Sequence, residues 1–395
     1  MPDEATRLRL TEVKLRGFKA AYEPPAVPLG MFNLLIGRSG SGKSTLIEAL
    51  EWIDTGIRRD IRAACDPFRG VTNLIHRRVG SPGAFDISTS FQVGAGIVPL
   101  VHRVQIGVVE GAPRLQQDEL AAGSGSLKAI LDGMTGPPEQ LRAGSDRYGN
   151  KSPRRAAVPA ALRPRRLVTH KLLLDKEHHA HFWHNAVFLR LVPAQLSEPG
   201  SLYRKSFEPI LDPAGRLLPA LLAEVLKDPT SRAALVAALQ DILPWARDLE
   251  VPRPLQGMDV ATSWVLREQF GPDTTPWEIP AWMLSDGTRR LTAILALLYR
   301  DPAPSLVCIE EVENGLDPWT VRALLRELQS AADRGVQIIA TTHSPWVLDD
   351  VPMDCILQAR RKEGDVLYER FADRPEVRAY DPSIPAGTRY VNEAE

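Results

Sequence analysis

Residues 31–52 read MFNLLIGRSGSGKSTLIEALEW, and this stretch decides the fold. Met31–Ile36 is mostly apolar and predicts a buried strand, whereas Ser44–Trp52 has helical spacing and contains no helix breaker. The residues between them, 37–44, match the Gly-x-x-x-x-Gly-Lys-Ser pattern of a phosphate-binding loop. A strand, this glycine loop and a helix in direct succession indicate a P-loop rather than a chance glycine-rich turn.

Each part of this loop has an expected task. The glycines allow the backbone to turn tightly, so that its N–H groups face phosphates, and the helix N-terminus adds partial positive charge. We expect Lys43 to reach the β- and γ-phosphates and the hydroxyl of Ser44 to bind Mg²⁺. The predicted nucleotide contacts in this loop are Gly37, Arg38, Ser39, Gly40, Ser41, Gly42, Lys43, Ser44 and Thr45.

A second short apolar run, Ser305–Ile309, ends in two carboxylates, Glu310 and Glu311. At the end of a buried parallel strand they stand at the carboxyl edge of the sheet, where open α/β folds bind their ligands. Neighbouring side chains on a strand point to opposite sides, so one carboxylate can face a metal and the other a water molecule. We assign Glu310 to Mg²⁺ and Glu311 to the water.

A third run, Val336–Ala340, precedes Thr341-Thr342-His343-Ser344. A histidine at such a strand end is placed to donate a hydrogen bond to a γ-phosphate, and we assign that task to His343. Between the second and third runs, Glu313–Pro318 reads ENGLDP, and its proline is expected to open the next helix.

The segment Leu284–Arg289 reads LSDGTR and precedes a strongly helical run, Leu291–Tyr299. Ser285 is a good N-cap, and the N-terminus of its helix suits an anion. An ordinary capped helix would explain the serine alone. Because the chain also carries a P-loop, a second helix N-terminus of this kind indicates a second phosphate contact.

Taken together, these motifs resemble the RecF/SMC/OLD branch of ABC-type ATPases, and within it the bacterial AAA-family ATPases without an appended nuclease domain. The resemblance rests on LRGFKA, GRSGSGKSTLIEAL, FLRLVPAQL, LSDGTRRLTAILALL, IEEVENGLDP and TTHSPWVLDD, which cover both ends of the chain well and its middle loosely. It implies an α/β fold, namely a P-loop NTPase with an ABC-type head, an antiparallel β lobe and a helical lobe. It also implies ATP and Mg²⁺ as cofactors. The partner it implies is a second copy, with Ser285 and Gly287 of one chain reaching the nucleotide of the other and Asp317 at the interface.

The chain departs from the family pattern at several positions. Glu310 stands where the family usually has aspartate, Arg38-Ser39 replaces the usual Pro-Asn, and Asp317 stands where close relatives often carry histidine. Arg38 either adds a cation near the γ-phosphate or faces solvent. By the same resemblance Gln195 is a metal-linking glutamine, or else a surface residue in a proline-rich loop.

The resemblance places three residues near the start of the chain beside the nucleotide base. Arg16 or Lys19 is expected to border it, and Tyr22 is a stacking candidate. The alternative is that the three side chains only shape the first hairpin.

Composition limits the organisation of the chain. With 395 residues and 44% hydrophobic content, one discontinuous ATPase head with inserted lobes fits better than separate domains. We divide it into four parts. Residues 1–110 hold the P-loop and a β meander over 84–110, and 111–194 are a variable insert. Residues 195–284 form the helical lobe, and 285–395 hold the signature (the LSDGTR motif), the acidic strand that ends in Glu310-Glu311, the ENGLDP segment and the sensor histidine, His343. No heptad repeat appears, so we expect no long coiled coil.

Charge and cysteine content limit the partners and the compartment. The net charge of −1 gives no global attraction to nucleic acid. The three cysteines lack metal or disulfide spacing, which is typical of a reducing cytoplasm. We find no apolar run of membrane-spanning length and no signal peptide, and therefore expect a cytoplasmic protein without a membrane partner.

Two polar segments in the middle of the chain each have two alternative interpretations. Within 141–171, nine cations accompany one acid, Asp146, so the segment is either a site for DNA or an acidic partner, or a solvated loop. The run His178–His184 is either a zinc site or a polar helix face.

Further along the chain, local patterns predict secondary structure. They predict helices over 215–226 and 231–249, a hairpin turning at Glu363-Gly364, and an extended tail from Arg374.

The motifs predict a slow ATP hydrolase that acts as a dimeric switch. The resemblance implies that this switch serves a separate effector, a nuclease or toxin, in a DNA-related or phage-defence process. One alternative is an ATP-bound scaffold with little turnover that holds such an effector. Another is a DNA-repair ATPase that binds DNA directly through residues 141–171.

Overall fold

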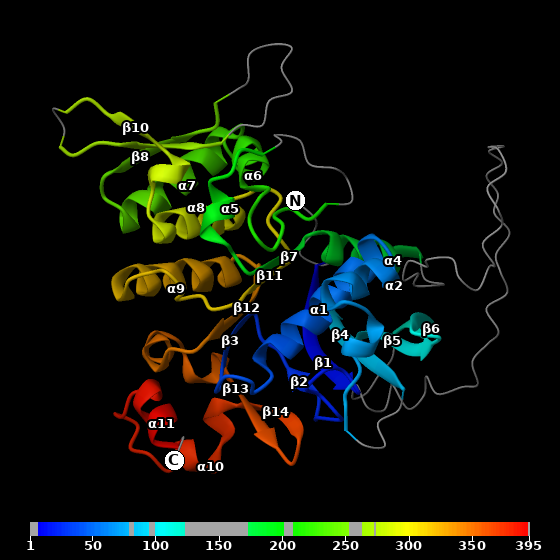
Figure 1. The fold of residues 1–395 in the computed structure, drawn as a ribbon. Coiled ribbons are helices and arrows are strands. Elements are labelled where there is room, and N and C mark those ends of the chain that lie inside the picture. Colours follow the sequence, from blue (N-terminus) through cyan, green and yellow to red (C-terminus); the bar gives the residue numbers. More distant parts are fainter. Residues whose placement is uncertain are drawn as a thin grey trace, which may run out of the picture.

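The computed structural model describes residues 7–78, 83–94, 99–122, 173–200, 208–252, 263–271 and 274–393. Its centre is a six-stranded sheet with the strand order β14-β13-β3-β12-β11-β7 (Figure 1). All neighbours in it are parallel except β13 and β14, which form an antiparallel hairpin. The strands are β3 (Phe32–Ile36), β7 (Ala186–Leu189), β11 (Leu306–Ile309), β12 (Gln337–Thr342), β13 (Ile356–Lys362) and β14 (Asp365–Arg370).

A second, five-stranded sheet is wholly antiparallel, with the order β2-β1-β4-β5-β6. It confirms the predicted meander and extends it, because β6 lies beyond residue 110 and still completes the same sheet. Its strands are β1 (Leu8–Arg16), β2 (Val27–Pro28), β4 (Ala84–Val93), β5 (Leu100–Val109) and β6 (Ala112–Ala122).

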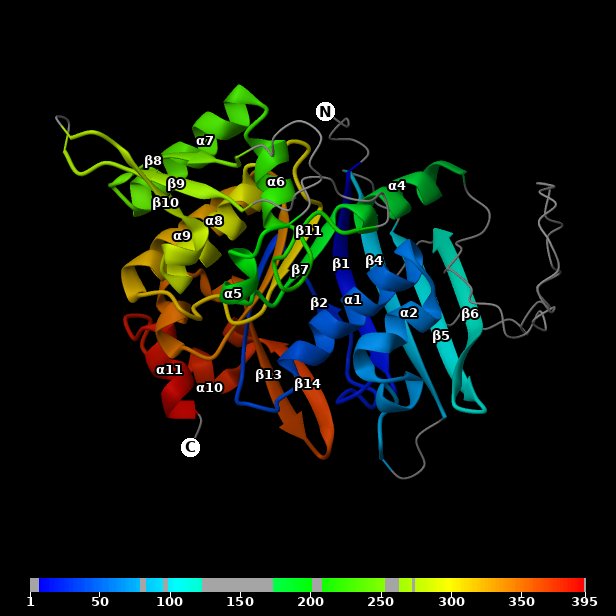
Figure 2. The same cartoon turned by 45° about the horizontal axis from the view of Figure 1, so that its top comes forward.

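The two faces of the central sheet support two hydrophobic cores. Because side chains alternate along a strand, Leu34 and Ile36 face one core whereas Leu35 faces the other. Helix α1 (Lys43–Arg58) fills the space between the central and antiparallel sheets, beside the short α2 (Ile61–Cys65) and α4 (Leu173–His184) (Figure 2).

In the described part of the chain, five helices cover the opposite face of the central sheet, and of these only α6 and α7 lie wholly within the predicted helical lobe, 195–284. They are α5 (Pro193–Leu196), α6 (Leu218–Val225), α7 (Pro229–Ile242), α8 (Asp286–Leu298) and α9 (Pro318–Asp333). The lobe also holds a three-stranded antiparallel sheet that we did not predict, with β8 (Ala246–Glu250), β9 (Val265–Glu268) and β10 (Trp277–Pro280). The helix predicted to run to residue 249 therefore ends at Ile242.

The C-terminal part confirms one prediction and corrects another. The hairpin turns at Glu363-Gly364 as predicted, between β13 and β14. The tail after Arg374 is not extended, because it forms α10 (Pro375–Arg378) and α11 (Ala386–Glu393). These helices are anchored by Arg389, which is buried and donates to the carbonyl oxygens of Val377 and Asp381.

The structure is a mixed α/β fold in which the described residues form no long coiled coil. Within the same described ranges, no helix combines the length and the apolar character needed to cross a membrane. The cationic segment 141–171 lies outside the described residues.

Candidate nucleotide site

The P-loop joins β3 to α1, as the sequence predicted. Gly42 precedes α1 with φ of 104°, which favours glycine, and a Cβ there would lie 2.7 Å from Cγ2 of Val366. The hydroxyl of Tyr368 donates to the carbonyl oxygen of Gly42 over 2.7 Å. Val366 and Tyr368 both belong to β14, so the β13–β14 hairpin contacts the phosphate loop and supports its backbone at Gly42.

The ammonium group of Lys43 lies inside this loop. Its Nζ donates to the carbonyl oxygens of Gly37 (2.6 Å) and Arg38 (3.2 Å) and lies 3.4 Å from Nδ1 of His343. Burial lowers the pKa of Lys43, although the charges of Glu311, Glu313 and Glu310 oppose that shift. The two residues predicted to hold the γ-phosphate, Lys43 and His343, are therefore side by side although 300 positions separate them.

Glu310 meets Ser44 on the same edge of the sheet. The Ser44 hydroxyl donates to Oε2 of Glu310 over 2.8 Å, and Arg190 donates through Nε to the other oxygen over 2.5 Å. An exposed hydroxyl beside a carboxylate is a donor set that suits the hard cation Mg²⁺, which prefers oxygen ligands. Ser44 and Glu310, the two predicted metal residues next to the loop, therefore fit the metal that this fold family implies.

Gln195, the third predicted metal residue, is not in that pair. It lies in α5, and its buried Oε1 has no hydrogen-bond partner within the described part of the chain. An unpaired buried acceptor is costly unless a ligand or water satisfies it, which is compatible with the predicted role.

Glu311 has a strained backbone next to His343. Its φ is 51°, a left-handed conformation that is uncommon for a residue with a side chain. Its N–H donates to the hydroxyl of Thr341 over 2.9 Å, and its carboxylate lies 3.9 Å from Nε2 of His343. Strain of this kind clusters at functional sites. The backbone N–H of His343 in turn donates to Glu313 over 2.8 Å, which holds the two loops together.

The signature segment caps a helix as predicted. Ser285 is the N-cap of α8, and its hydroxyl oxygen accepts from the N–H of Thr288 over 3.1 Å. A Cβ at Gly287 would lie 2.7 Å from the carbonyl oxygen of Gly315, so the start of α8 packs closely against the ENGLDP segment. Asp317 caps α9 by accepting from the N–H groups of Trp319 and Thr320.

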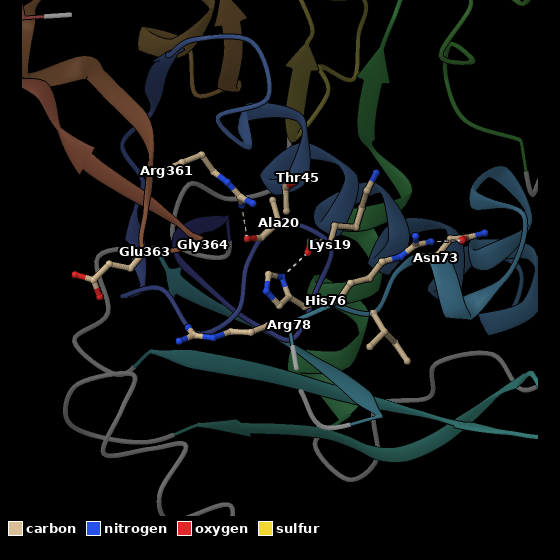
Figure 3. Close-up of a pocket in the computed structure, with 11 residues that line it drawn as sticks. Lys19, Ala20, Thr45, Asn73, His76, Arg78, Arg361, Glu363 and Gly364 are labelled. Carbon is tan, nitrogen blue, oxygen red and sulfur yellow. Dashed lines mark hydrogen bonds between the residues drawn. The ribbon is translucent and has the colours of Figure 1, made fainter. Parts of the chain in front are cut away.

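A cavity of about 640 Å³ opens beside the start of α1 (Figure 3). Thr45 contributes to its wall, as does Lys19, which we predicted to border the base. Arg16 is not among the lining residues and pairs with Glu23 instead. Tyr22 packs against His76. The other basic side chains of the wall are His76, Arg77, Arg78 and Arg361, and among the described residues that line it Glu363 alone is acidic.

The remaining predicted loop residues differ in exposure. Arg38, Ser39 and Gly40 are exposed at the tip of the loop, whereas Ser41 is buried, with a hydroxyl that has no hydrogen-bond partner in the described ranges.

The histidine run lies on helix α4 and forms a polar helix face in part, as one of the two alternatives predicted, but His179 departs from it. His181 and His184 are exposed on α4, but His179 is buried against Phe91 and accepts from Nε1 of Trp183. Within the described residues, no group of three or more metal-binding side chains is present.

Two arginines were missed by sequence reasoning. Arg190 pairs with Glu310, and the buried Arg290 donates to the carbonyl oxygens of Leu191 and Glu311. Neither lies in a recognised P-loop or acidic-strand motif. The available signal was position, since Arg190 follows the apolar run of β7 and Arg290 follows the signature.

Comparisons with known proteins agree with this geometry. Residues 32–349 match the family described as "AAA domain, putative AbiEii toxin, Type IV TA system". No curated protein matches the chain.

Two solved structures share the fold. One is described as the SmcHead bound to the C-winged helix domain of ScpA, with 14% identity, a TM-score of 0.57, and coverage of 91% of this chain and 96% of that one. The other is an Smc head domain with an extended coiled coil bound to the C-terminal domain of ScpA derived from Pyrococcus furiosus. It has 11% identity, a TM-score of 0.52, and coverage of 92% and 96%.

Proposed function

The chain belongs to the family described as "AAA domain, putative AbiEii toxin, Type IV TA system", and from this premise we propose that it is an ATP-hydrolysing switch that works as a homodimer. It is an ABC-type ATPase of the RecF/SMC/OLD kind. The observation that carries the proposal is the meeting of Lys43, His343 and the Ser44–Glu310 pair at one sheet edge. The basic cavity beside Thr45 supports it, since it offers room and positive charge for the remainder of a nucleotide.

The proposed roles follow from the contacts. Lys43 exchanges the carbonyl oxygens of Gly37 and Arg38 for phosphate oxygens. His343 donates to the γ-phosphate, and Glu311, held by Thr341, orients and polarises the attacking water. Ser44 and Glu310 hold Mg²⁺, which when bound neutralises charge on the phosphates.

Apolar side chains beside the motifs support self-association. Trp319 follows Asp317 closely and Trp346 follows His343, and each is 80% exposed. Trp282 and Met283 precede Ser285 and are exposed as well. Exposed large apolar side chains are candidates for an interaction surface when they share one face of a protein. In the proposed dimer they pack against the second copy, while Ser285, Gly287 and Asp317 of one chain approach the nucleotide of the other.

The experiment replaces Glu311 by Gln. The amide cannot accept the proton of the water, so the variant should bind ATP with Mg²⁺ normally, hydrolyse it at least about 100-fold more slowly, and accumulate as a dimer. Steady-state phosphate release and sedimentation with and without ATP measure both effects. Glu376→Gln, an exposed carboxylate on α10, is the matched control. Normal hydrolysis by Glu311→Gln would remove the proposed role of Glu311.

The biological role that we propose is the control of a separate nuclease or toxin in a defence or DNA-related process. The family description, which names a toxin of a toxin–antitoxin system, supports this direction. Slow turnover suits such gating. The measured rate separates this switch from a scaffold that holds ATP with little turnover.

A further inference from the structure

Arg190 lies between two carboxylates next to the predicted metal residues. Its Nε donates to Oε1 of Glu310 over 2.5 Å, and its Nη2 donates to Oε2 of Glu51 over 2.6 Å. The second oxygen of Glu310 accepts from the Ser44 hydroxyl. Since Ser44 and Glu51 both belong to α1, the four side chains and the helix form a closed ring of contacts.

The fold itself brings these residues together. Leu189 pairs with Ile309 at the end of the parallel β7–β11 ladder. Arg190 and Glu310 are the residues that directly follow these two adjacent strands, so they lie next to each other. The N–H of Glu310 also donates to the carbonyl oxygen of Leu189 over 2.9 Å, which holds this register one step beyond the strands. On α1, Ser44 and Glu51 are seven residues apart, two helical turns, and therefore share a face.

The two carboxylates of the ring are mostly shielded from water, whereas Ser44 is exposed and Arg190 is partly so. Side-chain exposure is 36% for Arg190, 17% for Glu51 and 16% for Glu310. Burial opposes the charge of Arg190, but the hydrogen bonds and charges of Glu51 and Glu310 outweigh it and raise its pKa. The guanidinium therefore stays charged, and its planar fork holds two carboxylates at fixed angles, which a lysine ammonium cannot do.

We propose that Arg190 is a positioning residue that holds the carboxylate of Glu310 so that only Oε2 faces Ser44 and the metal. This inference rests on the proposed Mg²⁺–ATP function. Glutamate has one more rotatable bond than the aspartate usual at this position, and fixing that bond costs conformational entropy. The contact with Arg190, itself fixed by Glu51, holds the longer side chain in place before metal arrives.

The test measures Mg²⁺-dependent binding of a fluorescent ATP analogue by the full chain, without reference to turnover. Replacing Arg190 by Gln should raise the Mg²⁺ concentration needed for half-maximal binding about ten-fold, as is usual when a partner of a metal ligand is lost. Arg190→Lys keeps the charge but not the fork and should show most of the same loss. Arg232→Gln, which breaks an Arg–Asp248 pair in the helical lobe, is the matched control and should not change the requirement.

A double-mutant cycle separates positioning from general support of the fold. In a Glu310→Asp background, the side chain has less freedom to restrain, so Arg190→Gln should raise the Mg²⁺ requirement much less than in the natural background. An equal effect in both backgrounds would mean that Arg190 only joins β7 to α1. Thermal unfolding without metal or nucleotide identifies misfolded variants, and Arg190→Lys decides the question if Arg190→Gln does not fold.

Two further outcomes would overturn the inference. A lower Mg²⁺ requirement in Arg190→Gln would show that the guanidinium competes with the metal, and wild-type behaviour of Arg190→Lys would show that charge alone suffices. If the natural protein binds no ATP in the presence of Mg²⁺, the proposed function fails. If it binds and Arg190→Gln matches it, only the role of Arg190 fails.

Discussion

At the scale of residues, the phosphate loop depends on side chains far from it in sequence. Tyr368 is buried in β14 and holds the Gly42 carbonyl through its hydroxyl. That carbonyl is the last one before α1, so its direction affects how the loop presents its N–H groups.

We predict that Tyr368→Phe weakens ATP binding several-fold and lowers the free energy of unfolding by about 1 kcal/mol, the usual net value of one hydrogen bond. Titration with an ATP analogue and denaturant unfolding measure the two effects. Tyr299→Phe removes a hydroxyl that donates to Glu327 over 2.6 Å, away from the loop. It should cost similar stability and leave ATP binding intact. Equal ATP affinities in the two variants would contradict a role for Tyr368 in the loop.

The proximity of site residues was predictable where a motif ends a strand. Lys43 and His343 follow buried strands whose carboxyl ends meet at one sheet edge, so sequence alone indicated that they lie close together. Arg190 also follows a buried strand, but no recognised chemistry marked it as a site residue, and only the register of β7 against β11 shows that it meets Glu310. The nucleotide and metal roles of the site residues remain predictions.

At the scale of elements, helix α4 carries a buried histidine, His179. Burial, and secondarily the charge of His102, lower the pKa of His179 well below its usual value of 6.5. His102 is itself buried, and its Nε2 forms a hydrogen bond with Oδ1 of Asp118 over 2.9 Å. Nε2 of His179 accepts a hydrogen bond from Nε1 of Trp183, so this nitrogen cannot take up a proton without losing that bond.

Acidification should therefore destabilise the protein. As the pH falls below about 6.5, the unfolded chain takes up a proton at this position that the folded chain does not, so the free energy of unfolding falls by up to about 1.4 kcal/mol per pH unit. His179→Gln keeps a hydrogen-bond acceptor for Trp183 and should flatten this slope between pH 6.5 and 5. His184→Gln, at an exposed position, should keep it. Urea unfolding at several pH values measures the slopes, and a slope unchanged by His179→Gln would exclude this source.

Elements were predictable from local pattern only where no distant partner competed. The hairpin at Glu363-Gly364 is local and was predicted correctly. The segment Ala246–Glu250 looked helical, but Pro244 cannot continue the helix and β9 offers a ladder of hydrogen bonds. Tertiary pairing therefore overrode the helical propensity.

At the scale of the whole molecule, replacing the exposed tryptophans should affect dimer formation but not the folding stability of the single chain. Replacing Trp282, Trp319 and Trp346 together by Ala should change stability little, because exposed side chains away from special features contribute at most about 0.5 kcal/mol each. The same variant should fail to dimerise with ATP while each chain still binds ATP. Analytical ultracentrifugation of Glu311→Gln with and without the triple substitution measures this.

A matched control uses another exposed aromatic cluster. Trp245 and Trp277 stack on either side of Phe270 in the sheet of the helical lobe. Replacing both tryptophans by Ala should leave ATP-dependent pairing intact. If this control abolishes pairing and the triple substitution does not, the dimer uses a different surface from the one proposed.

The support of the phosphate loop by β14 has a consequence for how the chain is made. The strand that leads into the loop, β3, is flanked by β12 and β13, both of which lie some 300 residues later in the sequence. During synthesis the loop therefore lacks these neighbouring strands and β14 until residues 337–370 have been made. A fragment that ends before β14 lacks Val366 and Tyr368, two residues of that strand that contact the phosphate loop at Gly42.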